Sequence, residues 1–342
     1  MSEVRSNGGE RDGAAQLLAA SRARVSAAAT DLALPERLRL SDRQRSALAH
    51  LVSRLIGDIE DEIRSALLAS VTGAPVRAAL SSAAVPIALP ILETSGLLSD
   101  PALIALLLRR AEEHRLARGR DGALLTELSG DPEEAVSAAA ISLIVAQSRR
   151  LDAFQEPLVG SVDLPAELLH MIAWTVAAAI RRYLVQVQNL PGSDADEAVA
   201  AAVSRLLAGC DEGDGVDAQA LRLARLLGVR ARLDDAFVAR AAEEGALPLF
   251  LAALSLRAEI DFSAAWEILA EPSGRGAVIL LKGAGVMRQP AVSALLALAE
   301  REEPVAAQLD LFDTLSDDEA RRLVSLWRRD PAYRGAVARL AA

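Results

Sequence analysis

The segment from Val85 to Ser148 constrains the fold of this chain more than any other part of the sequence. It is a series of apolar stretches, each about as long as a short helix, separated by Ser-Asp-Pro, Gly-Arg-Asp-Gly and Gly-Asp-Pro. Glycine and proline punctuate helices, and a cap residue directly before proline is typical of a helix start. The pattern therefore predicts short helices packed in pairs, and it indicates no particular chemistry.

The apolar residues of the chain favour a helical core. Hydrophobic residues make up 52% of the 342 residues, yet aromatic residues make up only 3%, so Ala, Leu, Val and Ile supply most of the apolar mass. Ala and Leu are among the strongest helix formers. The period-two alternation that is typical of strands is not convincing anywhere in the sequence. We therefore expect an all-α fold, and the length suggests about two domains.

Charge, cysteine content and hydropathy exclude several classes of protein. The net charge of −10 argues against nucleic acid as the main partner, because such proteins usually carry a basic face. Cys210 is the only cysteine, so no intrachain disulfide can form. The longest apolar stretch, Leu168–Ile180, is shorter than the roughly 20 residues that span a bilayer. The N-terminus lacks the apolar core of a signal peptide. We expect a cytoplasmic protein with no membrane span.

The first long helix is expected from Ser41 to about Ala69. Ser41 and Gln44 form the sequence pattern of a capping box. Apolar residues then recur at spacings of three and four, which places them on one helix face. This stripe comprises Leu48, Val52, Leu55, Ile59 and Ile63. Its spacing is nearly heptad and suits a two-helix seam, either within the chain or across a homodimer.

The remaining punctuation divides the chain into three parts. Residues 1–40 are expected to be a flexible segment with one Ala-rich helix at 14–29. Residues 41–160 are expected to form a HEAT-like helical repeat region, because helix starts of one type recur about 30 residues apart. Within it we expect helices at 76–81, 87–93, 101–110, 112–118, 122–128 and 132–149. Residues 161–342 are expected to form an all-helical C-terminal region.

Several landmarks resemble one known family. They are the stretch Val85–Leu92 with Leu97–Asp100, the segment Arg182–Val185 with Leu190-Pro191, and the block Leu247–Leu254 with Ala277–Leu281 and Gly283–Gly285. In these the chain resembles a group of alphaproteobacterial proteins that carry domain of unknown function 2336, over most of residues 41–300. The resemblance implies an all-helical, HEAT-like (α-solenoid-like) protein. It implies no activity, because the family has no catalytic motif to carry over.

The histidines do not have the spacing of a metal site. His50, His114 and His170 are far apart in the sequence, so we expect no bound metal and no cofactor. His50 lies off the apolar stripe and should face solvent on a long helix, where a phospho-accepting histidine of two-component signalling would lie. The residues that follow His50 lack the acidic neighbour of a histidine kinase, and an ordinary surface histidine is the simpler interpretation.

One arginine-rich loop carries the only ligand hypothesis. Residues 118–121 fit the R-x-x-D pattern of cyclic-dinucleotide inhibitory sites, and guanidinium groups are natural phosphate clamps. The candidate ligand-binding residues are Arg109, Arg110, Arg115, Arg118, Arg120 and Asp121. The alternative is an ordinary polar loop between helices, since so short a pattern arises by chance in an arginine-rich chain.

These observations lead to one functional expectation and one alternative. Stacked helices present extended surfaces that usually bind proteins. We therefore expect a non-enzymatic protein-interaction scaffold that also self-associates, because no acid, base and nucleophile set occurs at a recognisable spacing. The alternative is a bacterial signalling component, acting through phosphotransfer at His50 or through a cyclic dinucleotide at Arg118–Asp121.

Overall fold

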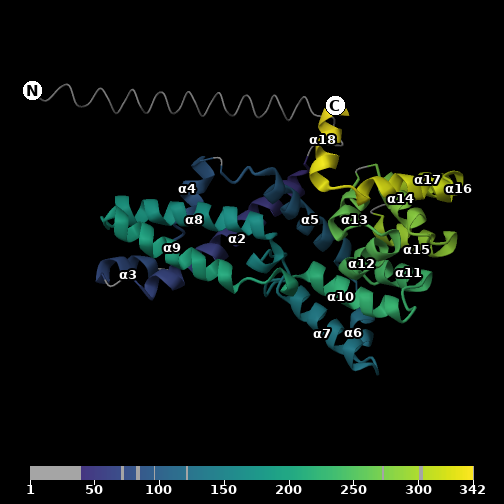
Figure 1. Ribbon diagram of the computed structural model, residues 1–342, viewed down its shortest axis with the longest axis horizontal. Coiled ribbons are helices and arrows are strands. Elements are labelled where there is room, and N and C mark those ends of the chain that lie inside the picture. The colour runs from purple at the N-terminus through teal and green to yellow at the C-terminus, as the bar shows by residue number, and fades with distance from the viewer. Residues whose placement is uncertain are drawn as a thin grey trace, which may run out of the picture. The chain divides into compact units, whose positions relative to one another are not determined.

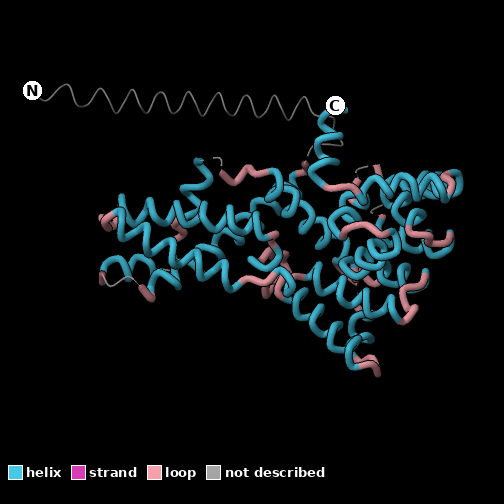
Figure 2. The backbone as a smooth tube through the Cα atoms, viewed as in Figure 1, coloured by secondary structure: helices cyan, strands magenta, loops and turns pink. Residues whose placement is uncertain are grey.

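The computed structural model describes residues 40–70, 73–81, 85–95, 97–120, 122–271, 273–299 and 303–341. Within these residues the fold is all-α, with 17 α-helices, three 3-10 turns and no strand. Figure 2 shows helices joined by loops and turns throughout this part of the chain. The all-α prediction is confirmed. The Ala-rich helix predicted at 14–29 lies outside the described residues.

The first half of the described chain contains helices α2 to α9 (Figure 1). Their bounds are α2 Asp42–Leu68, α3 Ala74–Ser81, α4 Ala88–Ser95, α5 Pro101–Ala117, α6 Ala123–Ser129, α7 Glu134–Ser148, α8 Ala166–Gln186 and α9 Gly192–Gly209. Helices α6 and α7 pack together, and so do α8 and α9. Adjacent helices joined by short loops thus form antiparallel pairs, as the punctuation of the sequence indicates.

The second half contains α10 to α18. Their bounds are α10 Val216–Val229, α11 Asp235–Glu243, α12 Leu247–Ala258, α13 Phe262–Leu269, α14 Arg275–Gly283, α15 Arg288–Leu298, α16 Glu303–Thr314, α17 Asp317–Ser325 and α18 Pro331–Ala341. Short 3-10 turns lie at Ser161–Asp163, Glu212–Asp214 and Leu326–Arg328. Helix α12 is buried along nearly its whole length, so it is the central helix of this half.

Local capping signals determine where several helices begin. The Gln44 N–H donates to the Ser41 hydroxyl at 3.2 Å and the Gln44 side chain accepts from the Ser41 N–H, so the predicted capping box is confirmed. The Asp100 carboxylate accepts from two backbone N–H groups in the first turn of α5. The prediction of separate helices at 101–110 and 112–118 is wrong, because α5 runs unbroken from Pro101 to Ala117. Nothing in its sequence breaks the ladder of backbone hydrogen bonds.

A buried ion pair on α2 holds the next two helices in place. The Glu60 carboxylate accepts from the N–H groups of Ile87 and Ala88, at 2.8–3.1 Å, and so caps the start of α4. Arg64, 3.1 Å from Glu60, donates to the carbonyl oxygen of Leu80 near the end of α3. One pair of side chains on α2 therefore satisfies backbone groups of two neighbouring helices that would otherwise be unpaired.

The main hydrophobic core joins both halves of the chain. It runs from Leu124 in α6 to Val324 in α17, and most of its members are Ala and Leu. Two glycines on α14 allow close helix approach. A Cβ on Gly276 would collide with the carbonyl oxygen of Ile268, and one on Gly283 would lie 2.5 Å from a Val324 methyl group. Because glycine has no Cβ at these two positions, α14 can pack closely against α13 and α17.

One helix of the described chain, Ala166–Gln186, is long and apolar enough to cross a membrane by length and composition alone. Half of its most apolar window is buried inside the protein. Buried core helices commonly pass this test. The absence of a membrane span stays a prediction.

Candidate functional site

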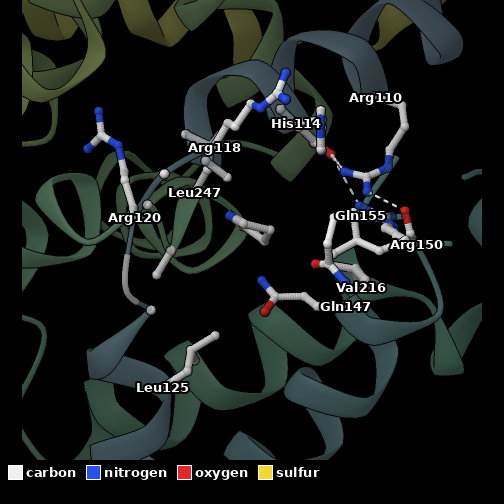
Figure 3. Close-up of a pocket in the computed structure, with 18 of the residues that line it drawn as sticks. Arg110, His114, Arg118, Arg120, Leu125, Gln147, Arg150, Gln155, Val216 and Leu247 are labelled. Carbon is white, nitrogen blue, oxygen red and sulfur yellow. Dashed lines mark hydrogen bonds and ion pairs between the residues drawn. The ribbon is translucent and has the colours of Figure 1, made fainter. Parts of the chain in front are cut away.

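A cavity of about 410 Å³ lies where the end of α5, the loop before α6, the end of α7 and the start of α12 meet. The segment between α7 and α8 forms part of its rim. Figure 3 shows Arg110 and Arg150 on one side of the space and Arg118 and Arg120 on the other. Its apolar lining includes Leu125, which lies at the bottom of the same view. Small-molecule sites typically occupy about 300–1,000 Å³, so this cavity is large enough for one.

Beside the cavity lies a set of three arginines and three carboxylates, of which Glu113 and Arg150 are buried and the others are half-buried. We call it the arginine–carboxylate network, and it consists of Arg109, Arg110, Arg150, Glu113, Asp163 and Asp217. Its formal charges balance. The network joins α5, the 3-10 turn before α8, and α10, which are far apart in the sequence.

Glu113 lies at the centre of this network. Its carboxylate accepts from Arg109 at 2.7 Å and from Arg150 at 3.2 Å, and Arg110 lies 3.8 Å away. Arg109 also donates to Asp217 at 2.7 Å, and Arg150 donates to Asp163 at 2.7 Å. The guanidinium of Arg109 further lies over the rings of Phe262 and Trp266, 4.9 and 5.8 Å from their centroids. These groups are therefore used to hold the fold together.

The pKa values of the three arginines differ because their partners differ. Burial lowers the pKa of an arginine, yet the carboxylates of Glu113 and Asp217 outweigh burial at Arg109 and raise its pKa. Burial is likewise outweighed at Arg150, chiefly by Asp163 and Glu113, and its pKa is raised. At Arg110 burial and the positive charge of Arg150 lower the pKa to about 10. Arg110 donates mainly to backbone carbonyls, which stabilise its charge less than a carboxylate does.

Most of the predicted ligand-binding arginines are occupied within the protein. Arg109 and Arg110 belong to the network, and Arg115 pairs with Glu112 at 2.6 Å. Arg120 borders the cavity but donates to the backbone carbonyl oxygens of Ala242, Glu243 and Ala297. It thereby ties the loop before α6 to α11 and α15.

Two members of the predicted set remain. Arg118 is exposed at the rim of the cavity, and its side chain has no partner within the described residues. Asp121 lies outside the described residues. Binding of a ligand at the six predicted residues stays a prediction, with Arg118 as the arginine that is free to take part.

The other predicted residues lie on α2. His50 is exposed, as its position off the stripe predicts, but its role as a phospho-acceptor stays a prediction. In the apolar stripe, Val52 is half-buried and the other four residues, Leu48, Leu55, Ile59 and Ile63, are buried within the chain. This burial favours the intrachain seam over the dimer seam, because a dimer through the stripe would have to expose the core.

Sequence reasoning missed the partners that complete the network. Arg150, Asp163 and Asp217 give no local signal, since each lies far along the chain from the residues it contacts. The spacing of Arg109 and Arg110 to Glu113, four and three residues on one helix, could have indicated part of it. Among the described residues no group of three or more His, Cys, Asp or Glu is placed to hold a metal ion.

The chain was compared with protein families, curated proteins and solved structures. No curated protein and no solved structure matches it. One family does match, over residues 87–325, which is more than half of the chain. The matched range begins later and ends later than the resemblance noted in the sequence. The chain therefore belongs to the family described as an uncharacterised protein conserved in bacteria, DUF2336.

Proposed function

We propose that this chain is a cytoplasmic, non-enzymatic scaffold that binds a partner protein, built as a HEAT-like helical array. The packing of consecutive helices supports the array, since α11, α12, α13, α14 and α15 contact one another in order along the chain. Such arrays bind partners along extended surfaces. The observation that carries the proposal is the outer face of α10.

Helix α10 has two faces of different character. Its inner face is buried in the core through residues such as Leu223 and Leu227. Its outer face carries Ala218, Leu221, Arg222, Arg225, Leu226 and Val229 at helical spacing. Two adjoining hollows of about 430 and 700 Å³ lie along this face and share Arg225 and Val229. The spacing is that of a surface that pairs with another helix.

The charges on this face indicate what it binds. Val229 is 85% exposed and Leu221 and Leu226 are half-buried, so apolar surface is available. Arg222 and Arg225 are exposed and pair with no carboxylate among the described residues. The chain as a whole is acidic, with a net charge of −10, so this positive patch has the opposite sign to the net charge of the protein. The proposed occupant is an acidic amphipathic helix of a partner protein, which would complement both properties.

Site-specific photo-crosslinking in the cells that make the protein tests this proposal. A Val229→benzoylphenylalanine variant is expected to crosslink to a protein with an acidic amphipathic helix. The same replacement at Val187, an exposed valine at the end of α8, is the matched control and should give no such product. Arg225→Glu should reduce the yield at position 229 at least fivefold, whereas Arg182→Glu on α8 should leave it unchanged.

Three results would contradict the proposal. A crosslink to a second copy of the chain would assign the face to a homodimer. No specific product at position 229, or a yield that ignores the charge of residue 225, would remove the face from consideration.

A signalling component is the second candidate. Arg118 supports it, because this arginine lies at the rim of a cavity of ligand size and its side chain pairs with none of the residues that the structure describes. Calorimetric titration with cyclic di-GMP tests the ligand that the R-x-x-D pattern suggests, and the absence of heat would count against that ligand. For His50, transfer of label from a phosphorylated response regulator is the test, with His50→Ala as the control.

A further inference from the structure

The cavity beside α5 contains polar side chains that the fold does not use. Arg118 is exposed at the end of α5, Gln147 is half-buried in the last turn of α7, and Gln155 is exposed on the opposite rim. None of the three side chains has a hydrogen-bond partner within the described residues. Two amides and one guanidinium thus face a cavity whose floor includes the apolar Leu125 and Val216.

A stiff hairpin presents an aromatic ring at the same rim. Phe154 lines the cavity and is 86% exposed, although exposing a phenyl ring forgoes about 1.5–3 kcal/mol of burial. Asp152 fixes the loop, because its carboxylate accepts from the N–H groups of Phe154 at 2.8 Å and Glu156 at 2.9 Å. Gln155 has a left-handed φ of 63°, which completes the turn.

The base of the hairpin is tied to the arginine–carboxylate network. Leu151 and Pro157 form an antiparallel bridge, and the Leu158 N–H donates to the Arg150 carbonyl at 2.7 Å. Arg110 donates to the carbonyl oxygens of both Arg150 and Leu158. The backbone that carries Phe154 is therefore held by hydrogen bonds within the hairpin and at its base.

The hydrogen bonds to Asp152 also protect the hairpin against acid. The N–H groups of Glu156 and Phe154, with the charges of Arg54 and His50, outweigh partial burial and lower the pKa of this carboxyl group. A lowered pKa means that the stabilising charge is present at neutral pH and is lost only as the pH falls through that lowered value. The hydrogen bonds from the hairpin backbone to Asp152 therefore persist to a lower pH than those to an ordinary aspartate would.

We propose that this cavity binds a nucleoside monophosphate, with the base stacked on Phe154 and the phosphate held by Arg118. Stacking of a base on an aromatic ring contributes about 1–3 kcal/mol. The amides of Gln147 and Gln155 offer both donors and acceptors for the edge of a base. A free guanidinium is the preferred group for a phosphate. The lining also includes the carboxylates of Glu113, Glu156 and Glu244. Glu113 and Glu244 are paired with arginines of the protein, so the phosphate is assigned to the side of Arg118, which pairs with none of the described residues.

This site is separate from the proposed partner face on α10 and gives the signalling alternative a ligand class. The partner crosslink at Val229 and the nucleotide titration can each fail without the other. The two inferences are therefore independent.

Calorimetric titration of the full chain with GMP, AMP, CMP and UMP tests the inference. At least one of these mononucleotides is expected to bind. The corresponding nucleoside (guanosine for GMP) and inorganic phosphate, each tested alone, should bind at least tenfold more weakly. Arg118→Ala and Phe154→Ala should each weaken binding at least tenfold, and Gln147→Leu at least threefold. Arg182→Ala, at an exposed arginine of α8 outside the cavity, is the matched control and should leave binding unchanged.

The substituted residues at 118 and 154 are exposed, so the variants are expected to fold, and circular dichroism checks this. If no mononucleotide binds, or if binding survives both substitutions, the inference is wrong. Binding of cyclic di-GMP in place of every mononucleotide would also overturn it and would favour the dinucleotide hypothesis.

Discussion

Replacing Glu113 with glutamine should destabilise the protein more than any other single loss of charge in α5. The side chain is 4% exposed and lies within 3.8 Å of three arginines. Glu113→Gln leaves those three guanidinium groups with two carboxylates, so one buried positive charge is no longer balanced. Breaking a buried ion pair by removing one partner costs about 3–5 kcal/mol.

Urea unfolding followed by circular dichroism measures this loss. With a denaturant slope of about 3 kcal/mol per molar, the midpoint should fall by roughly 1–1.7 M. Glu112→Gln is the matched control, since Glu112 is the preceding residue of the same helix and pairs with Arg115 nearer the surface. Partly exposed pairs contribute about 0–1 kcal/mol, so this midpoint should fall by less than about 0.3 M.

A Glu113→Gln midpoint equal to that of Glu112→Gln would refute the reasoning. It would mean that the network contributes no more than a surface pair. A double variant that also replaces Arg110 sharpens the comparison, because it restores charge balance. It should recover part of the loss that the single variant suffers.

Three further substitutions test other features by the same unfolding assay. Glu60→Gln should lower the free energy of unfolding by about 3–5 kcal/mol, because it weakens the cap of α4 and leaves the charge of the buried Arg64 unbalanced. The control Asp61→Asn, at a side chain that is 72% exposed, should cost under about 1 kcal/mol. Equal losses would contradict this account. Gly276→Ala should destabilise the protein by about 1–3 kcal/mol, because the added Cβ has no room against α13. Gly57→Ala in α2, where the added Cβ meets open space, should instead stabilise the protein by up to about 1 kcal/mol. Burial, opposed in part by Arg54 and aided by the like charge of Asp61, raises the pKa of Asp58, so its charge costs stability at neutral pH. Because solvent screens this partly exposed group, Asp58→Asn should raise the unfolding free energy at pH 7 by no more than about 0.5 kcal/mol. The gain should vanish near pH 3, where the carboxyl group is protonated in both states.

Features that depend on neighbouring residues could be predicted from the sequence. The capping box at Ser41 and the Asp100 cap each involve groups within three residues of each other, so their patterns are visible locally. The buried stripe of α2 follows from helical periodicity in the same way. The prediction of two helices in place of α5 treated its two apolar runs as separate helices, although no glycine or proline lies between them.

The candidate site depended on contacts that no local pattern shows. Arg109 and Arg110 lie on the same helix that ends just before Arg118, yet they are half-buried and paired while Arg118 is exposed. Which arginine is free is decided by Asp217 and Asp163, whose positions beside α5 follow only from the packing of later helices. The exposure of Phe154 could not be predicted either, because the hydrogen bonds that fix its loop, from the loop backbone to Asp152 and from Arg110 to Leu158, form only in the folded chain.

The network also determines where this chain can be divided. Arg109 and Asp217 are 108 residues apart, and Arg150 is separated from Asp163 by a boundary near residue 160. A fragment that stops at residue 160 would keep all three arginines and Glu113 but lose the other two carboxylates. The surface that is buried in the full chain would then carry an unbalanced positive charge in the fragment. The parts of the chain before and after residue 160 are therefore expected to behave as one cooperative folding unit, and attempts to express either part alone should yield aggregated or unfolded protein.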